Sequence, residues 1–340
     1  MSQYVPPRGR STHAEDLDFV RTNIPCQWAC PAFTDIPGYI EAVFRGEYDR
    51  AYLINRRSNL FPGVLGRICT RPCEDACRHG ETDLGKPVTI CHIKRVSADF
   101  KSDDHLIQER LFSPTGKSIG VVGAGPAGLA VAHSLALFGH KVVIYEAFDE
   151  PGGMLMYGIP AFRLPRTVIH EEIFNVLRQG ITVKTGVEFG VDETVESLMA
   201  QHDAVVLAMG CQEPRDLAAP GETLPGVYSG LDFMLRVNTG EKSCVGRRVF
   251  VIGGGFTAMD CCRSARRLGA EEIFVAIRGV EEDLTVPMDE IREIHREGIR
   301  FLSLVSTVAV EGTDRVTGIR FIRNRFGGVR GSSGRRVVPI

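Results

Sequence analysis

The 340-residue sequence has almost no net charge. Its 40 Lys and Arg residues are balanced by 42 Asp and Glu residues, which leaves a formal net charge of −2. A protein that binds nucleic acid or an anionic membrane surface through charge normally carries a basic excess. The composition therefore predicts neither a nucleic-acid partner nor a membrane-surface partner.

The sequence also lacks an apolar run suited to export or to a membrane span. Pro, Arg and acidic residues interrupt the stretch from Met1 to Phe19, where a signal peptide would need continuous apolar residues. The segment from Ile119 to Gly139 contains no Asp, Glu, Lys or Arg, but its glycines and its proline have the spacing of a loop. We expect a cytoplasmic protein without a membrane span.

No C-x2-C pair occurs among the 10 cysteines. This absence argues against a thioredoxin-reductase-type dithiol and against most zinc fingers. Clustered thiols rarely form disulfides in a reducing compartment, so metal ligation is the better explanation for a group of early cysteines with x3 spacings. An iron–sulfur cluster is favoured, and zinc or unligated thiols are the alternatives. The group comprises Cys26, Cys30, Cys69, Cys73, Cys77 and Cys91.

The pattern of the chain changes near residue 113. Before it, apolar residues have helical spacing, as in 39–45 and 48–56, and no alternating strand pattern appears. After it, the order strand, glycine turn, helix, strand occurs twice, which indicates two nucleotide-binding domains. We predict an α/β protein with a helical cysteine-rich, iron–sulfur-type domain followed by two Rossmann-like domains. The predicted ranges are 1–112, 113–240 and 241–340, and the predicted strands are 118–122, 141–145, 248–252 and 273–277.

The first glycine loop follows strand 118–122 and opens a helix predicted over 126–138. Gly123 would permit a tight turn, Gly125 would let the backbone approach a pyrophosphate, and Gly128 would let the helix pack close to the strand. Glu146 follows strand 141–145, where a carboxylate accepts hydrogen bonds from ribose hydroxyls. The loop residues predicted to bind a dinucleotide are Gly123, Gly125, Pro126, Ala127 and Gly128.

The second glycine loop carries Gly253 and Gly255, with Ala258 in place of the third glycine and Thr257 placed to cap the helix 257–268. Arg278 follows the next strand, at the position that normally meets the adenosine ribose. A 2′-phosphate would favour several basic groups there, whereas acidic residues at 281–283 follow a single arginine. We therefore expect NAD(H) in preference to NADP(H), with both open. In the helix, Cys261 and Cys262 are predicted to be core residues, and Arg263, Arg266 and Arg267 a solvated face.

Three stretches resemble the small subunit of glutamate synthase and the matching half of dihydropyrimidine dehydrogenase. They are NLFPGVLGRICTRPCEDAC at 59–77, GGMLMYGIPAFRLP at 152–165 and GGGFTAMD at 253–260. The resemblance implies a helical domain with two 4Fe-4S clusters, then an FAD domain into which an NAD(P)H domain is inserted. It also implies FAD contacts from Gly123, Gly125, Gly128, Glu146, Gly153 and Met154, and nicotinamide nucleotide contacts from Gly253, Gly255, Thr257 and Arg278. Arg163 and Gly210 complete the predicted cofactor-binding set.

The sequence departs from the family in its cluster ligands. Relatives usually have two more cysteines before the one that matches Cys26, and in the family these join the equivalents of Cys26 and Cys77 on the first cluster. The second cluster uses the equivalents of Cys30, Cys69 and Cys73 with a later side chain, whose position falls near Lys94. Cys91 lies about one helical turn earlier and is a possible substitute. We expect at most one cluster, on Cys30, Cys69, Cys73 and Cys91, with Cys26 and Cys77 as alternative ligands; loss of both clusters is the other possibility.

Two further departures concern the nucleotide sites. Phe256 stands where relatives usually have Asp, which would alter the fit of the nicotinamide nucleotide. Relatives also continue past the region 320–340 with segments that complete the inserted domain and the FAD site. We therefore expect the natural chain to continue beyond Ile340; the alternative is that a partner completes the flavin pocket.

The resemblance implies an NAD(P)H-dependent FAD oxidoreductase that exchanges a hydride between the two cofactors and passes electrons to or from iron–sulfur centres. The cofactors carry this chemistry, so no side chain is predicted to be catalytic. The expected partners are catalytic or ferredoxin-like iron–sulfur subunits of a larger complex, and a glutamate synthase small subunit is the specific alternative. A self-contained NADH diaphorase or flavin reductase and a noncatalytic nucleotide-binding scaffold remain open.

Overall fold

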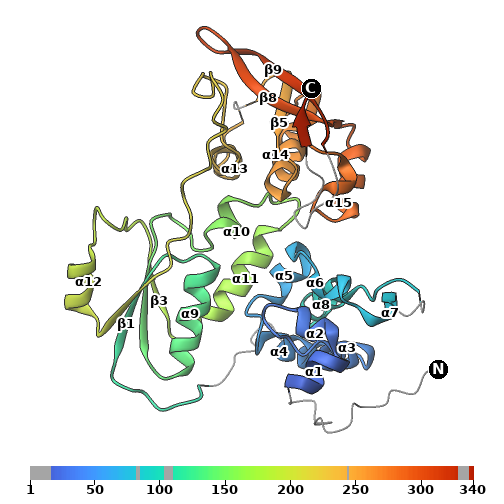
Figure 1. Cartoon of the computed structure of the whole chain (residues 1–340). Helices are drawn as coiled ribbons and strands as arrows, with labels where there is room; N and C mark the ends of the chain where they lie inside the picture. The colour runs from blue at the N-terminus through green and yellow to red at the C-terminus, as the bar shows by residue number, and fades with distance from the viewer. Residues whose placement is uncertain (1–16, 82–84, 103–109, 243–244, 328–336) are drawn as a thin grey trace. The chain divides into compact units, whose positions relative to one another are not determined.

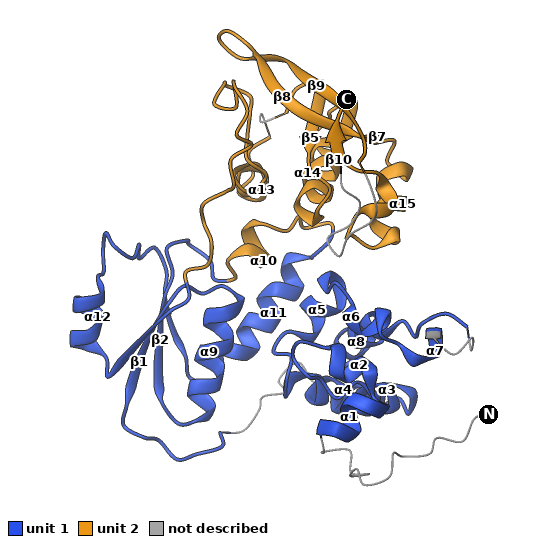
Figure 2. Ribbon diagram, in the orientation of Figure 1, with its two compact units in different colours: residues 1–151, 163–208 blue, residues 152–162, 209–340 orange. Residues whose placement is uncertain are grey.

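The computed structural model describes residues 17–81, 85–102, 110–242, 245–327 and 337–340. The chain divides into two compact units, which Figure 2 distinguishes by colour. Residues 1–151 and 163–208 form the first unit, and residues 152–162 and 209–340 form the second. No described helix is both long enough and apolar enough to cross a bilayer.

Short helices make up the amino-terminal part of the first unit (Figure 1). Proline begins α2, α5 and α6, where its missing N–H costs no helical hydrogen bond. The described residues of this part contain no strand, in agreement with the predicted helical domain. The helices are α1 (Leu17–Asn23), α2 (Pro25–Ala29), α3 (Ile36–Phe44), α4 (Tyr48–Arg56), α5 (Pro62–Ile68), α6 (Pro72–Asp75), α7 (Arg78–Glu81) and α8 (Ile90–Asp99).

The helical part has a core of its own, in which Tyr39 of α3 and Ala51 of α4 are fully buried. Helices α5 and α8 pack closely, since a Cβ on Gly66 would lie 2.7 Å from the Cα of Arg95. Cys69 is the C-cap residue of α5, and Cys91 lies in the first turn of α8. The close approach of the two helices therefore positions two predicted cluster ligands near each other.

A parallel four-stranded sheet forms the other part of the first unit, with strand order β3-β2-β1-β4. The strands are β1 (Ser118–Val122), β2 (Lys141–Tyr145), β3 (Thr182–Lys184) and β4 (Ala204–Leu207). The helices are α9 (Pro126–Leu137), α11 (Arg166–Leu177) and α12 (Val195–Gln201). Helix α9 connects the parallel neighbours β1 and β2 and packs on both. This βαβ arrangement confirms the predicted Rossmann-like fold, and β1 and β2 have the predicted bounds.

The second unit contains a second parallel sheet and an antiparallel one. The parallel sheet has the order β5-β6-β7, and the antiparallel sheet has the order β10-β9-β8. The strands are β5 (Arg248–Ile252), β6 (Glu272–Ala276), β7 (Arg300–Leu302), β8 (Val305–Gly312), β9 (Val316–Phe326) and β10 (Val337–Pro339). The helices are α10 (Met154–Tyr157), α13 (Gly230–Asn238), α14 (Phe256–Arg267), the 3-10 helix η1 (Glu281–Asp283) and α15 (Met288–Arg296).

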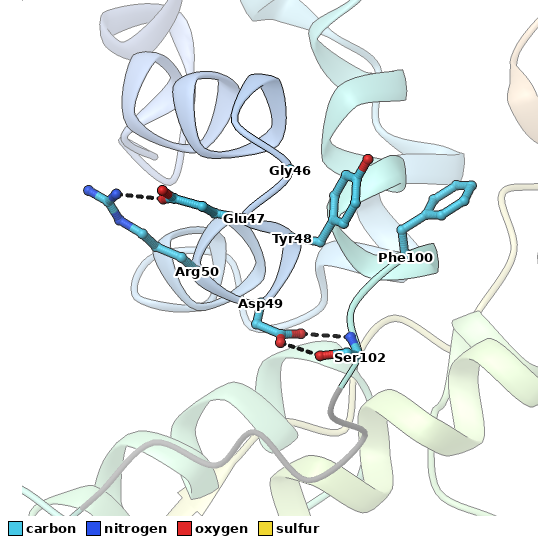
Figure 3. Close-up of a pocket in the computed structure, with 7 residues that line it drawn as sticks. All are labelled: Gly46, Glu47, Tyr48, Asp49, Arg50, Phe100 and Ser102. Atoms are coloured by element: carbon cyan, nitrogen blue, oxygen red, sulfur yellow. Dashed lines mark hydrogen bonds and ion pairs between the residues drawn. The ribbon is translucent and has the colours of Figure 1, made fainter.

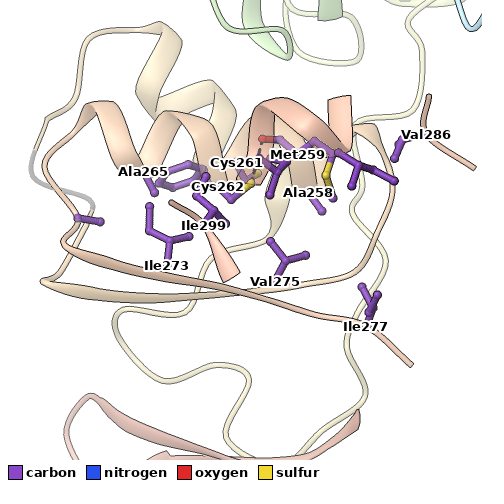
Figure 4. Packing of buried hydrophobic residues seen from close by; sticks show 14 of the residues in the cluster. Ala258, Met259, Cys261, Cys262, Ala265, Ile273, Val275, Ile277, Val286 and Ile299 are labelled. Atoms are coloured by element: carbon purple, nitrogen blue, oxygen red, sulfur yellow. Dashed lines mark hydrogen bonds between the residues drawn. The ribbon is translucent and has the colours of Figure 1, made fainter. Parts of the chain in front are cut away.

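Helix α14 packs its apolar face on the parallel sheet of the second unit (Figure 4). Met259 and Cys262 of the helix are fully buried with Ile273 and Val275 of β6. Cys261 is 6% exposed, so the prediction that both adjacent cysteines are core residues is confirmed. This core fixes the glycine loop at the start of α14 against the sheet.

The basic residues of α14 were expected to form a solvated face. That expectation is wrong for Arg263 and Arg266, which are half-buried, whereas Arg267 is exposed as expected. The side chain of Arg263 is 11% exposed, and its Nε lies 2.9 Å from Oε1 of Glu297. The guanidinium carbon of Arg267 lies 3.8 Å from the centroid of the Phe162 ring. Arg266 donates hydrogen bonds to the carbonyls of Glu297 and Ala270. These residues therefore hold the segment 152–162 and the end of α15 in the second unit.

The predicted domain ranges stay a prediction. Helix α8 ends at Asp99 and β1 begins at Ser118, which brackets the predicted boundary at residue 113. The segment 152–162, predicted within the FAD domain, lies in the second unit together with 209–240. The side-chain amide of Asn238 donates a 2.7 Å hydrogen bond to the carbonyl of Tyr157, which ties the two segments together.

Candidate cofactor sites

The first glycine loop has the geometry of a pyrophosphate cradle. Gly123 has a φ of +98°, a conformation that favours glycine. A Cβ on Gly128 would lie 1.9 Å from the carbonyl oxygen of Gly123, so only glycine permits this contact between the helix and the loop. Pro126 and Ala127 are exposed at the start of α9, where free N–H groups and the helix dipole attract a phosphate.

Glu146 is fixed beside this loop. It follows β2 directly and is 6% exposed. Its Oε2 accepts a 2.7 Å hydrogen bond from the N–H of Ala124, and its Oε1 accepts a 3.0 Å hydrogen bond from the N–H of Phe148. The carboxylate is thus held at the ends of β1 and β2, where a ribose lies in dinucleotide-binding folds. The residues at the first loop fit the adenosine half of FAD.

The second glycine loop is more open. Gly253 has a φ of +123°, and a Cβ on Gly254 would lie 2.3 Å from Cδ2 of Leu284. A Cβ on Gly255 would meet no atom within 4 Å. At Gly255 a ligand phosphate therefore has room to approach the protein backbone.

Helix α14 begins one residue earlier than predicted, and this changes the role of two residues. Gly255 is the N-cap residue and no side chain caps the helix, so the prediction that Thr257 caps it is wrong. Thr257 is exposed within the first turn, while Ala258 is buried. Phe256 packs against the apolar core of the second unit, which gives this departure from the family a structural role.

Arg278 lies just beyond β6 and is exposed. Its backbone carbonyl accepts a hydrogen bond from the side-chain amide of Asn324, at 3.4 Å. Of the acidic residues that follow, Glu281 lies 2.6 Å from Nε2 of His295. One of the carboxylates on which the predicted preference for NADH depends therefore contacts a histidine.

The remaining predicted cofactor-binding residues lie in both units. Gly153 has a φ of +51° and is the N-cap residue of α10, which begins at Met154. Gly210 has a φ of +75° and also belongs to the second unit, whereas the half-buried Arg163 belongs to the first. Their contact with a nucleotide stays a prediction.

The four predicted cluster ligands lie in the helical part of the first unit and are free thiols. A hydrogen bond from Cys91 lowers the pKa of Cys69 to about 6, against the effect of its burial. The N–H of Arg71 also donates to Sγ of Cys69, at 3.4 Å. Burial raises the pKa of Cys73 to about 12, and the nearby Cys69 and Cys30 add to this rise. The four thiols therefore lie close enough for one to shift the pKa of another.

The sulfur atoms of the four cysteines do not all face a common point. The Sγ of Cys91 lies 3.3 Å from the carbonyl of Leu65, and that of Cys30 lies 3.4 Å from Oγ1 of Thr34. Within the described ranges, no three His, Cys, Asp or Glu side chains form a group that could hold a metal ion. Four buried or half-buried sulfur donors nevertheless match what a 4Fe-4S cluster requires, so the ligand set stays a prediction.

The alternative ligands Cys26 and Cys77 form a second neighbourhood. Cys26 is half-buried in α2, and Cys77, 8% exposed, follows α6, which packs against α2. Burial raises the pKa of Cys26, and the thiols of Cys77 and Cys30 add to this rise. Cys30 is thus adjacent to both groups of cysteines.

Two protein-family models match the chain. Residues 117–325 match the model of pyridine nucleotide-disulphide oxidoreductases, and residues 21–106 match dihydropyrimidine dehydrogenase domain II, 4Fe-4S cluster. The chain belongs to the pyridine nucleotide-disulphide oxidoreductase family. The predicted resemblance and the cofactor types, namely FAD, a nicotinamide nucleotide and a 4Fe-4S cluster, are confirmed at the level of this family.

Several curated relatives of this oxidoreductase are subunits of larger enzymes. The chain is 35% identical to the NADP(+)-dependent formate dehydrogenase subunit beta of Moorella thermoacetica, over 93% of this chain and 48% of the relative. It is 36% identical to the NADPH-Fe(3+) oxidoreductase subunit beta of Geobacter sulfurreducens, with the same coverage. It is 33% identical to the glutamate synthase [NADPH] small chain of Azospirillum brasilense, over 93% of this chain and 68% of the relative. The chain spans about half the length of the first two relatives.

Solved structures support the fold of the oxidoreductase. Mycobacterium tuberculosis FprA in complex with NADPH matches with a TM-score of 0.58 at 20% identity, over 66% of this chain and 67% of that one. A 2-naphthoyl-CoA reductase matches with a TM-score of 0.54 at 21% identity, over 88% of this chain and 43% of that one. At these identities the likeness extends to the fold alone.

Sequence reasoning missed one buried group of this family member, Glu172 on α11. Its Oε2 accepts a 2.8 Å hydrogen bond from the hydroxyl of Tyr52, and its Oε1 accepts a 2.6 Å hydrogen bond from the N–H of Gly63. Burial raises the pKa of Glu172 to about 7, although both hydrogen bonds oppose the rise. The carboxyl group joins α11 to α4 and α5 of the helical part. Nothing in the local sequence signals this role, because the partners are far away along the chain.

A surface pocket lies at the start of α4 and contains none of the predicted site residues (Figure 3). Asp49 accepts hydrogen bonds from the N–H and the hydroxyl of Ser102, and Arg50 forms an ion pair with Glu47. The ring of Tyr48 lies 5.7 Å from that of Phe100. These polar groups are paired with each other, so the pocket offers no argument for a cofactor.

Proposed function

We propose that the chain is a flavoprotein electron-transfer subunit of a multi-subunit iron–sulfur oxidoreductase. NAD(P)H would deliver a hydride to FAD, and electrons would pass singly to or from iron–sulfur centres. The observation that carries this proposal is the combination of two glycine loops at βαβ turns with a cysteine-rich helical part in one chain. The names of relatives that are beta subunits or small chains support it.

The residues of the first loop would hold FAD, with Glu146 on the adenosine ribose and with Gly153, Met154, Arg163 and Gly210 as further contacts. The second loop would hold the nicotinamide nucleotide, with Arg278 at its ribose. The 4Fe-4S cluster would take Cys30, Cys69, Cys73 and Cys91. The protein binds and orients these groups, and no side chain needs to act as acid, base or nucleophile.

We propose NADPH as the natural nucleotide, in contrast to the sequence-based preference for NADH. The side chain of Glu281 already has a partner, since its Oε2 lies 2.6 Å from Nε2 of His295. Arg278 is exposed and has no side-chain partner among the described residues. The relatives above carry NADP(+) or NADPH in their names.

The proposed partners are catalytic or ferredoxin-like iron–sulfur subunits, and the proposed location is the cytoplasm. The relatives supply the coarser statement that such chains are components of multi-subunit oxidoreductases. The three domain ranges predicted from the sequence belong to this proposal.

Anaerobic purification of the full chain tests the proposal. The expected result is a flavin absorption spectrum, together with iron and sulfide that match one 4Fe-4S cluster per chain. Stepwise addition of NADPH should bleach the flavin. A chain that binds flavin and reduces a dye without iron would instead be a self-contained diaphorase. A colourless chain would contradict the proposal, and bleaching by NADH but not by NADPH would contradict the choice of nucleotide.

A further inference from the structure

Phe162 ends the segment 152–162, and its ring lies against two arginines of α14. The guanidinium carbon of Arg267 lies 3.8 Å from the centroid of the ring, and that of Arg263 lies 5.0 Å from it. The two arginines are four residues apart, so they share one face of the helix. Phe162 is 38% exposed, so contact with the guanidinium groups, rather than deep burial, fixes the ring.

The two guanidinium groups are themselves held by carboxylates of α15 and of the residue that follows it. Nε of Arg263 lies 2.9 Å from Oε1 of Glu297, and the side chain of Arg263 is 11% exposed. Nη1 of Arg263 lies 3.4 Å from Oε2 of Glu290. Nη1 of Arg267 lies 2.8 Å from Oε2 of Glu297. Planar groups held at several atoms have little freedom to move, so the ring of Phe162 meets a rigid surface.

A second contact holds the middle of the same segment. The side-chain amide of Asn238, the last residue of α13, donates a 2.7 Å hydrogen bond to the carbonyl of Tyr157. Helix α13 packs closely on α14, since a Cβ on Gly230 at the start of α13 would lie 2.9 Å from Cγ2 of Thr257. Thr257 lies in the first turn of α14, directly after the second glycine loop. The segment is therefore tied at two points to the helices that meet beside this loop.

The second unit thus carries residues of both proposed nucleotide sites. The segment includes Gly153 and Met154, which are proposed to contact FAD, and α14 begins at the loop proposed for the nicotinamide nucleotide. Helices α10, α13 and α14 all belong to this unit (Figure 2). Hydride transfer needs the donor and acceptor rings in a narrow range of geometry, and a displacement of about 1 Å can slow a reaction about 100-fold. A segment fixed to α14 keeps its flavin contacts at a constant position relative to the nucleotide loop.

We propose that Phe162 is a positioning residue for hydride transfer. Its ring, held by Arg263 and Arg267, keeps the flavin-contacting segment at a fixed position relative to the second glycine loop. This inference depends on the function proposed above. The hydride carries two electrons from NADPH to FAD, and no bond is made or broken at Phe162. Loss of the contact between ring and guanidinium groups should slow flavin reduction and leave the binding of both nucleotides unchanged.

Rapid mixing of the full, flavin-containing chain with NADPH tests this role. Phe162→Leu keeps an apolar side chain but removes the ring, so the limiting rate of flavin reduction should fall about tenfold, while the Kd for NADPH and the flavin content stay within about twofold. Phe162→Tyr keeps the ring and should react like the wild type. Phe174→Leu is the matched control, because Phe174 of α11 is 54% exposed and its ring centroid lies 5.7 Å from the guanidinium carbon of Arg178, outside the segment.

Hydrogen exchange of the full chain gives a second measurement that does not depend on catalysis. The N–H groups of Met156 and Tyr157 both donate to the carbonyl of Gly153 and hold α10 together. In Phe162→Leu these N–H groups should exchange about tenfold faster, because a segment released at its end opens more often. Phe162→Tyr and Phe174→Leu should exchange like the wild type at the same positions.

The possible results are distinct. A slower rate with faster exchange in Phe162→Leu, and neither change in Phe162→Tyr, supports the positioning role. A wild-type rate in Phe162→Leu, a slower rate without faster exchange, or an equal fall in Phe174→Leu overturns it. Loss of FAD, or a weaker Kd for NADPH at an unchanged limiting rate, also overturns it, since Phe162 would then act in binding. A wild-type chain that binds no flavin removes the proposed function and this inference with it, whereas a flavin-containing chain whose rate and exchange do not depend on Phe162 removes this inference alone.

Discussion

Both glycine loops lie at a βαβ turn, but they differ in the burial and hydrogen bonding of the side chains beside them. In the first, Glu146 is 6% exposed and its two oxygens are held by the N–H groups of Ala124 and Phe148. In the second, Arg278 is exposed without a side-chain partner among the described residues, and there is free space at Gly255. The first loop is preorganised, and the second is open.

This difference matches two kinds of ligand. A buried acceptor already held in place loses little conformational freedom on binding, which favours a cofactor that stays bound. An exposed arginine and an open loop suit a nucleotide that enters and leaves during each turnover. We therefore expect FAD to survive purification and the nicotinamide nucleotide to exchange freely.

The largest expected difference between the two loops is in their response to an added methyl group. Gly128→Ala would place a Cβ 1.9 Å from the carbonyl oxygen of Gly123, so the backbone must shift, at a cost of about 3 kcal/mol, and FAD should be lost. Gly255→Ala has open space and an ordinary φ, so the stability should change by less than about 0.5 kcal/mol. The flavin-to-protein absorbance ratio and urea unfolding measure both variants. Equal flavin content in the two would break the comparison.

The sequence was sufficient to predict the parts of the fold that depend on local pattern. Strands β1, β2 and β5 have the predicted bounds, because each is a short apolar run that lies close to a glycine along the chain. Gly128 and Glu146 were placed from their spacing alone, and the structure gives both the predicted surroundings. Such features depend on residues that are near each other along the chain.

Other features depend on distant partners and escaped prediction. Glu172 is buried because Tyr52 and Gly63 come to it from the helical part, more than a hundred residues away. The ion pair of Arg263 with Glu297 joins two helices, and no local pattern distinguishes it from a solvated arginine. Convergence of the cysteines is also a tertiary property, so spacing could suggest ligands but could not establish which of them meet.

A second prediction uses pH to weaken the first unit selectively. The pKa of Glu172 is about 7 in the folded chain against an ordinary 4.5, so the folded state binds this proton more tightly than the unfolded state. The resulting stabilisation is fully present below about pH 4.5 and is lost as the pH rises through 7. The free energy of unfolding falls by about 3 kcal/mol over this range of pH, because each pKa unit corresponds to about 1.4 kcal/mol. Glu172→Gln should remove this loss, because its amide stays neutral.

Urea unfolding at several pH values measures this effect. Trp28 is the single tryptophan and lies in the first unit, so its fluorescence reports on that unit. The exposed Glu41→Gln is the control and should keep the wild-type pH dependence. If Glu172→Gln and the wild type lose stability equally between pH 5 and 8, the buried carboxyl is not the cause.

A third prediction concerns the preorganised carboxylate itself. Glu146→Ala removes the acceptor of two N–H groups and the proposed ribose contact. The free energy of FAD binding should become less favourable by about 2 kcal/mol. FAD affinity should fall by about 30-fold, while the affinity for NADPH should be unchanged. Fluorescence titration of the flavin-depleted chain measures the first quantity. Glu150→Ala, an exposed neighbour, should bind FAD like the wild type; an equal loss in that variant would assign the effect to the general charge of the region.

The smallest expected effect tests the open loop. Arg278→Ala should raise the KM for NADPH about fivefold, equivalent to about 1 kcal/mol, because an exposed arginine gains only part of a charged hydrogen bond with a 2′-phosphate. The KM for NADH should hardly change, since NADH has no phosphate at that position. Arg278→Lys should keep most of the preference, because the charge remains. Steady-state dye reduction with both nucleotides measures these constants, and flavin content should stay at the wild-type level. An Arg278→Ala chain that loses FAD would show that the two loops are not independent, and the contrast between a retained and an exchanging nucleotide would then fail.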